Sequence, residues 1–175
     1  CEILEQLHIE PTSKVVVLGD GKLGLTTALT LNALNLDVLL VGKHQNKLDI
    51  AKAQGVKVSL LNDFAIEKKY DVVVEATGST GGFETSASLV KPRGVLVLKS
   101  TIAAREGLNL ASIVVDEITI QGSRCGQFKP VVKLLEEQKI DVKPLVSGIY
   151  DVDKFERAFE LNSQKGTLKV LVKFD

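Results

Sequence analysis

The stretch Val15-Val-Val-Leu-Gly19-Asp-Gly-Lys-Leu-Gly24 decides the fold of this chain. Its short β-branched apolar run predicts a strand that is buried on both faces. In the G-x-G-x-x-G spacing that follows, Gly19 permits a sharp turn, Gly21 lets a pyrophosphate approach the backbone, and Gly24 lets a helix pack closely. The first turn of that helix offers free N–H groups and a positive dipole end to an anion. The residues expected to contact the phosphates are Gly19, Gly21, Lys22, Leu23 and Gly24.

The segments around this motif favour a dinucleotide over other ligands. Glycines with this spacing also occur in plain strand-to-helix turns, but here a second apolar run, Asp37–Val41, completes a strand–helix–strand unit of suitable length. The spacing disfavours an S-adenosylmethionine site, whose glycine loop usually reads G-x-G-x-G. A phosphate loop of the Walker type is disfavoured too, because no G-K-[ST] follows the glycines.

The loop Gly42–Lys47 predicts which dinucleotide is preferred. An NAD site normally has Asp or Glu at the end of the second strand, about 20 residues past the glycines, where it binds the ribose hydroxyls. Gly42 stands there, while Asp37 opens the strand and Asp49 falls inside the next helix. The missing acid and the nearby cations together predict NADP over NAD, although a solvated basic loop would have the same composition. The residues assigned to this part of the site are Gly42, Lys43, His44 and Lys47.

Residues that follow three later strands are expected at the same edge of the sheet. Ligands of open parallel sheets bind outside the carboxyl ends of the strands, so these residues are candidates for the middle of the cofactor and its nicotinamide end. They are Ala76, Thr77 and Gly78 after the fourth strand, Lys99 and Ser100 after the fifth, and Ser123, Arg124 and Cys125 after the sixth.

Two groups near these strand ends have a chemical role that the sequence leaves open. Glu75 is a lone carboxylate, for which a catalytic base is possible but a structural role is favoured. Cys125 is expected to touch the nicotinamide. A catalytic thiol is disfavoured, because neither His8 nor His44 is placed to activate it.

The remaining pattern predicts an α/β protein with a three-layer, doubly wound Rossmann fold and a six-stranded parallel sheet. We expect a turn at 91–94, and we interpret the apolar residues of 111–120 as a strand region. Asp151 is a candidate cap for a helix that begins at Val152. The strands of the sheet are expected at 15–18, 37–41, 56–60, 70–75 and 95–98, followed by the 111–120 region, and a last strand is expected at 167–174. Helices are expected at 48–54, 81–89, 128–139 and 152–162.

The composition excludes several classes of protein. The 175 residues include 22 Lys plus Arg and 22 Asp plus Glu, so the net charge is zero and no basic field favours nucleic acid or an anionic membrane. No apolar run is long enough to span a bilayer, and we recognise no signal peptide. Cys1 and Cys125 predict free thiols in a reducing compartment, hence a cytoplasmic protein. A chain that begins with Cys and has no Met is expected to be a fragment.

The order of these features resembles the nucleotide-binding domain of the medium-chain dehydrogenase/reductase family, specifically its zinc-type alcohol dehydrogenase-like members. The resemblance covers essentially the whole chain, and the order and spacing of its motifs make it specific. The motifs are Gly19–Gly24, Asp71–Gly78, Pro92–Val97, Ile118–Ser123 and Gly166–Val172.

The resemblance implies which domain each part of the chain belongs to. Residues 1–14 would end a helix from an N-terminal catalytic domain that is absent here and holds the zinc, 15–145 would form the NAD(P)-binding domain, and 146–175 would return toward the catalytic domain. The residue that matches Lys169 reaches the pyrophosphate in this family. Such subunits often join as dimers along the strand region that matches Ile113–Ile120.

The activity implied is hydride transfer between the nicotinamide cofactor and a small alcohol, aldehyde or ketone. A non-catalytic dinucleotide-binding or sensor module is the alternative, since the fold does not fix the function. Zinc ligands upstream of Cys1 would separate the two hypotheses.

Overall fold

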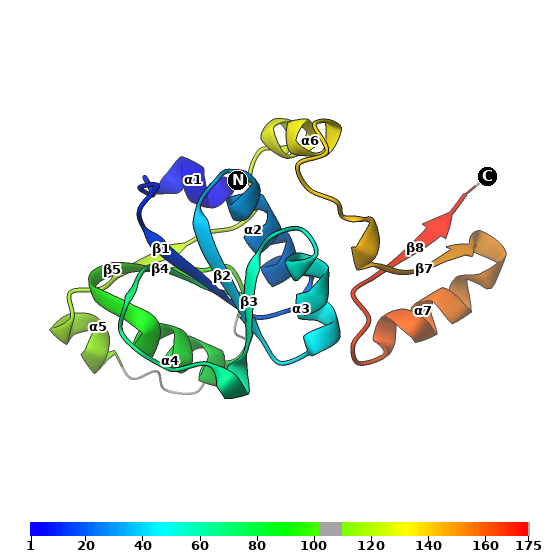
Figure 1. The fold of residues 1–175 in the computed structure, drawn as a ribbon. Coiled ribbons are helices and arrows are strands. Elements are labelled where there is room, and N and C mark those ends of the chain that lie inside the picture. Colours follow the sequence, from blue (N-terminus) through cyan, green and yellow to red (C-terminus); the bar gives the residue numbers. More distant parts are fainter. Residues whose placement is uncertain (102–109, 175) are drawn as a thin grey trace. The chain divides into compact units, whose positions relative to one another are not determined.

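A computed structural model describes residues 1–101 and 110–174 of the chain (Figure 1). Contacts divide it into two units, Cys1–Ile140 and Asp141–Asp175. The first unit holds the glycine turn and the whole six-stranded sheet.

The sheet has the strand order β3-β2-β1-β4-β5-β6, and every neighbouring pair is parallel. The central strands β1 and β4 are the apolar runs most fully buried, as expected for strands covered on both faces. The sequence-based prediction of a doubly wound six-stranded sheet is therefore confirmed. The strands are β1 (Lys14–Leu18), β2 (Asp37–Gly42), β3 (Lys57–Leu60), β4 (Tyr70–Glu75), β5 (Val90–Leu98) and β6 (Thr119–Gly122).

Helices cover both faces of the sheet (Figure 1). The strand order runs outward in opposite directions from the β1/β4 pair, so right-handed crossovers place α2 and α3 on one face and α4 and α5 on the other. The carboxyl ends of β1 and β4 thus lie at the point where the strand order reverses, which is where open α/β sheets bind ligands. The helices are α1 (Glu2–Gln6), α2 (Lys22–Ala33), α3 (Gln45–Lys52), α4 (Thr80–Leu89), α5 (Ala111–Val115) and α6 (Phe128–Glu136), with a 3-10 turn η1 (Leu61–Asp63).

The core between the sheet and α4 fixes the position of this edge. Val16, Val73, Phe83 and Leu96 are each at most 2% exposed and belong to one apolar cluster. Burial of each such side chain stabilises the fold by about 1.5 to 3 kcal/mol, so β1 and β4 form a rigid support for the loops that follow them.

Two segments differ from the expectation. Residues 111–115, which we interpreted as part of a strand region, form α5. The helix ends in a turn at Glu117, which has a φ of 52°, and the Ile118 N–H donates to the Ile113 carbonyl at 2.9 Å. The chain then enters β6. Residues 91–94, expected as a turn, belong to β5, where a register shift against β4 and a φ of 63° at Arg93 keep a local kink.

The unit Asp141–Asp175 pairs β7 with β8 in parallel, with a helix between them. The predicted helix begins later than expected, because a 3-10 turn intervenes and the Asp151 side chain makes no capping hydrogen bond with the described backbone. The elements are η2 (Lys143–Leu145), β7 (Val146–Asp151), η3 (Val152–Lys154), α7 (Phe155–Ser163) and β8 (Lys169–Lys173).

Candidate functional site

The glycine turn between β1 and α2 has the close approach that its spacing predicts. A Cβ on Gly24 would lie 1.8 Å from the Gly19 carbonyl oxygen, and Gly19 itself has a φ of 119°. A Cβ on Gly21, in contrast, would meet nothing within 4 Å. Gly24 is therefore needed for packing, whereas the space above Gly21 is open to a ligand. Gly21 is the N-cap of α2. Because glycine has no side chain, it makes no side-chain capping hydrogen bond to the first N–H groups of the helix.

A cavity of about 580 Å³ lies beside this turn. Its volume falls within the range of about 300 to 1,000 Å³ that small-molecule and cofactor sites occupy. The cavity brings together the ends of three strands and the start of α4, and we call it the glycine-turn cavity. Its lining includes Gly19, Asp20, Gly21, Gly42, Lys43, His44, Ala76, Thr77, Ser79 and Thr85. The open backbone at Gly21 and the cationic rim fit a dinucleotide phosphate.

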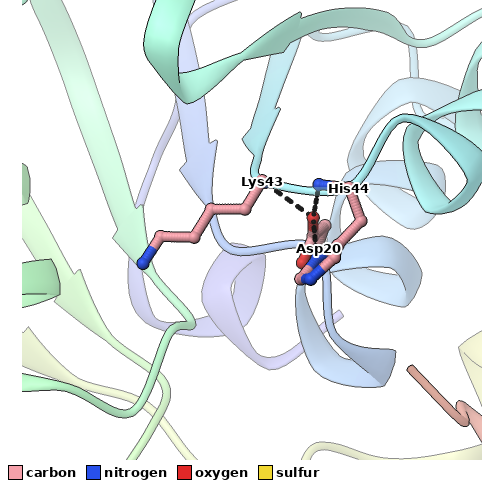
Figure 2. A network of polar contacts seen from close by, with 3 residues as sticks. All are labelled: Asp20, Lys43 and His44. Carbon is pink, nitrogen blue, oxygen red and sulfur yellow. Dashed lines mark hydrogen bonds and ion pairs between the residues drawn. The ribbon is translucent and has the colours of Figure 1, made fainter. Parts of the chain in front are cut away.

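Asp20 is a member of this site that the sequence reasoning missed. Its carboxylate reaches across to the loop after β2, where Oδ2 accepts hydrogen bonds from the N–H groups of Lys43 and His44, both at 2.7 Å (Figure 2). The same oxygen lies 2.9 Å from Nδ1 of His44. The expectation that no carboxylate stands near the end of β2 is therefore wrong. The sequence signal that could have revealed this contact is the combination of an acid inside the glycine motif, Asp20, with a glycine at the end of the second strand, Gly42.

The Asp20 carboxylate remains ionised in this position. Burial alone would raise the pKa of Asp20, but the hydrogen bonds from His44 and Lys43 outweigh it and hold the pKa below its ordinary value. The residue is only 8% exposed, so most of its charge is met by the loop rather than by water.

The three predicted cations of the loop have different positions. Lys43 and His44 line the glycine-turn cavity, and the Lys43 side chain extends away from Asp20 (Figure 2). Lys47 is 9% exposed on α3 and is not part of the lining. The helix begins at Gln45 and turns Lys47 into the packed side, so the structure does not bring this ammonium to the cavity.

Glu75 organises the loop after β4. This fully buried carboxylate accepts hydrogen bonds through Oε1 from the Thr77 N–H and hydroxyl, both at 2.6 Å, and from the Gly78 N–H at 3.2 Å. Its Oε2 accepts from the Ser100 hydroxyl, which ties the loop after β5 to the loop after β4. With both oxygens engaged, the carboxylate acts as a structural group, which is the role that we favoured over a catalytic base.

The residues after β5 and β6 meet at a second cavity of about 290 Å³. Lys99 donates to the Arg124 carbonyl and lies 3.4 Å from the Ser123 hydroxyl, and burial lowers its pKa. Cys125 and Leu23, in the first turn of α2, also line this cavity, whereas Gly21, just before α2, lines the glycine-turn cavity. Both cysteines are free thiols.

Comparison with known proteins decides the family. The model of the family described as glucose dehydrogenase C-terminus matches residues 4–174. The chain belongs to this family. It is the nucleotide-binding domain of a zinc-type alcohol dehydrogenase-like protein, and the resemblance that its motifs carried is confirmed.

Relatives of this dehydrogenase domain are longer than the chain. A probable D-xylulose reductase A from Aspergillus clavatus is 28% identical over 97% of the chain, which spans 52% of that protein. The chain therefore spans about half the length of the curated relatives that it matches.

Solved structures share the fold of this dehydrogenase domain. S. aureus TarJ in complex with NADPH has a TM-score of 0.86 at 20% identity, covering 99% of this chain and 60% of its own. A protein described as a short chain alcohol dehydrogenase from E. coli CFT073, complexed with NADH, has a TM-score of 0.84 at 18% identity, with coverage of 99% and 56%.

Three expectations concern features outside the two cavities. Lys169 opens β8 in the unit Asp141–Asp175, so its contact with a pyrophosphate stays a prediction. Within residues 1–101 and 110–174 of this dehydrogenase domain, no cluster of three or more His, Cys, Asp or Glu side chains could hold a metal ion. The described helices include none that is long and apolar enough to cross a membrane.

Proposed function

We propose that this chain binds NADP(H) in preference to NAD(H) and serves as the cofactor half of an oxidoreductase. The observation that carries the proposal is the glycine turn, where Gly24 packs against Gly19 while the space above Gly21 stays open. The adenosine would lie in the glycine-turn cavity, and the diphosphate would cross the N-terminus of α2, where Lys22 is exposed.

The preference for the 2′-phosphate rests on the loop after β2. Gly42 offers no carboxylate of its own, and the Asp20 charge is met by two N–H groups and an imidazole. Lys43 is exposed at the cavity and adds a positive charge that a 2′-phosphate, but not a 2′-hydroxyl, would attract.

The nicotinamide would lie toward Lys99, Ser100 and Cys125, past the N-terminus of α2. Bound there, it would supply the hydride chemistry, and the chain would supply orientation and charge. Ser100 has a defined place in this arrangement because Glu75 and the Gly78 N–H, at 3.0 Å from its hydroxyl, hold it.

We infer that the whole protein is a zinc-dependent enzyme of the cytoplasm that interconverts a small alcohol and its carbonyl counterpart. The zinc-type family and the reductase that resembles the chain support this assignment. The two free thiols suit a reducing compartment.

The test is a calorimetric titration of the chain with NADPH and with NADH at neutral pH. We expect NADPH to bind at least about tenfold more tightly, a difference of about 1.4 kcal/mol, and Lys43→Ala to reduce that ratio. A tighter complex with NADH would overturn the cofactor preference while leaving dinucleotide binding in place.

We also propose that two copies join along β6. This strand ends the sheet in the described part of the chain, and an unpaired edge favours pairing with another strand. Ile120 is 39% exposed on β6, and Val114 and Val115 on the preceding α5 are more than 70% exposed. Light scattering on Ile120→Lys should show a monomer where the parent chain is a dimer. Ile66→Lys, at an exposed site far from β6 in sequence, is the matched control; equal masses for all three chains would contradict the proposal.

A further inference from the structure

Asp20 fills the space at the end of β2 in which an NAD site normally has an acidic side chain. A Cβ on Gly42 would lie 2.5 Å from Cβ and 2.7 Å from Oδ2 of Asp20. A side chain at the end of β2 is therefore excluded by the carboxylate from the glycine turn. Asp20 and Gly42 are coupled features, and the loop that carries Lys43 and His44 is held by Asp20 rather than by a residue of β2.

This contact decides which nitrogen of the neutral His44 ring carries the hydrogen. An ionised carboxylate only accepts hydrogen bonds, so Nδ1 of His44, 2.9 Å from Asp20 Oδ2, must carry a hydrogen. In the neutral ring, Nε2 is then a bare acceptor. Such an acceptor can receive the 2′-hydroxyl of NADH, but it repels the oxygens of a 2′-phosphate. Only the imidazolium can donate to a phosphate from Nε2.

The ring is placed to meet the ligand. His44 lines the glycine-turn cavity, and its side chain is 54% exposed although its Nδ1 contacts Asp20 (Figure 2). The charged groups around it are Asp20 from the turn before α2 and Lys43 from its own loop; on α3, Asp49 is engaged by Gln45 at 2.7 Å. The described lining residues from the β4–α4 side, such as Thr77 and Ser79, are uncharged.

We propose that Asp20 and His44 form a proton-coupled reader of the adenosine 2′-phosphate, in which His44 binds the phosphate as imidazolium and Asp20 is its positioning residue. The proposal rests on the proposed NADP(H) function and adds its pH dependence. NADPH binding takes up a proton at His44, whereas NADH binding takes up none. Discrimination between the two cofactors therefore grows as the pH falls.

The test is a set of calorimetric titrations between pH 6.5 and 8.5, in two buffers of different ionisation enthalpy so that proton uptake is counted directly. For the parent chain, the dissociation constant for NADPH should rise with pH, by up to about tenfold per unit for one proton, while that for NADH stays level. The ionisation of the 2′-phosphate itself, near about pH 6, is common to all chains and is measured as the baseline with His44→Gln.

Three variants separate the contributions. His44→Gln keeps a hydrogen-bonding side chain but cannot titrate, so only the proton exchange of the 2′-phosphate itself should remain on NADPH binding. Asp20→Asn keeps an oxygen for the two N–H groups but removes the charge that faces His44, so proton uptake on NADPH binding should fall. His8→Gln is the matched control, because His8 also faces a carboxylate, Glu10 at 2.9 Å, and should leave the profile unchanged.

The outcomes distinguish the two proposals. If His44→Gln binds NADPH with the same pH profile and proton count as the parent chain, the proton-coupled reader is wrong even though NADPH binds. If Asp20→Asn keeps both its melting temperature and the parent chain's pH dependence of NADPH binding, Asp20 is not a positioning residue for His44. If NADPH binds at no pH, the proposed function fails first.

Discussion

The α-carbon of Gly24 stands so close to the Gly19 carbonyl that a methyl group on Gly24 would lie 1.8 Å from that oxygen. This contact fixes the first turn of α2 against the end of β1. It also separates two kinds of glycine within one motif, since Gly21 has no neighbour within 4 Å of its missing Cβ. One glycine serves the fold, and the other serves the ligand.

Gly24→Ala should destabilise the fold by about 3 kcal/mol, at the upper end of the cost of overpacking, because backbone rather than a flexible side chain blocks the new methyl group. Urea denaturation measures the change in the free energy of unfolding. Gly122→Ala is the control and should be nearly neutral, since a Cβ on Gly122, unlike one on Gly24, would meet nothing within 4 Å. Equal stability of the two variants would contradict the packing role of Gly24.

Gly21→Ala should cost at most about 1 kcal/mol of stability, because Gly21 is the N-cap of α2, and should weaken binding of NADPH at least about tenfold. The backbone there, with φ of −76° and ψ of 178°, accepts alanine without strain. The new methyl group would occupy the space through which the diphosphate approaches. Circular dichroism melting and calorimetry on the same sample measure both quantities.

Glu75→Ala should destabilise the fold by about 3 kcal/mol, because the N–H groups of Thr77 and Gly78 would lose their acceptor and a buried cavity would open. Glu84→Ala, at an exposed position on α4, is the control and should have little effect. If denaturation midpoints for both variants matched the parent chain, the loop after β4 would not depend on Glu75.

Acid should weaken the fold through Asp71. Burial acts to raise the pKa of Asp71, but the Lys91 ion pair and the Lys14 N–H, at 2.7 Å, lower it more. A depressed pKa adds stability above the ordinary value near about 3.9, and this stability is lost as the pH falls through the folded-state pKa. Asp71→Asn should therefore cost about 1 kcal/mol at pH 7 and less below about pH 4.

Urea denaturation at pH 7 and at pH 3 measures this difference between Asp71→Asn and the parent chain. Asp63→Asn, an exposed acid in η1, is the control. An Asp71→Asn deficit of equal size at both pH values would show that the carboxylate contributes through packing and not through its charge.

The sheet was predictable from sequence because its strands are local signals. Continuous β-branched runs such as Val15–Leu18 mark strands buried on both faces, and glycines such as Gly55, with a φ of 83°, mark where helices stop. The first half of 111–120 misled us, since Ile113-Val-Val115 has strand-like composition but forms a short helix that a turn at Glu117 closes. Composition alone cannot separate these outcomes over so few residues.

The site was predictable only in part, because its decisive contact is long-range. The glycine motif and the strand ends could be located by spacing, but the bond from Asp20 to the loop at Lys43 and His44 joins residues 23 and 24 positions apart. The absence of an acid at Gly42 was visible in the sequence. Its cause, a carboxylate that already fills that space, required the structure.

The most direct test is a calorimetric titration of NADPH into the parent chain and into Gly21→Ala, after both are shown to be folded at the temperature of the titration. We expect saturable binding of one NADPH per parent chain and loss of most of that affinity in Gly21→Ala. Equal binding by the two folded chains, or no binding by the parent chain, would contradict the assignment of the glycine turn as the dinucleotide site.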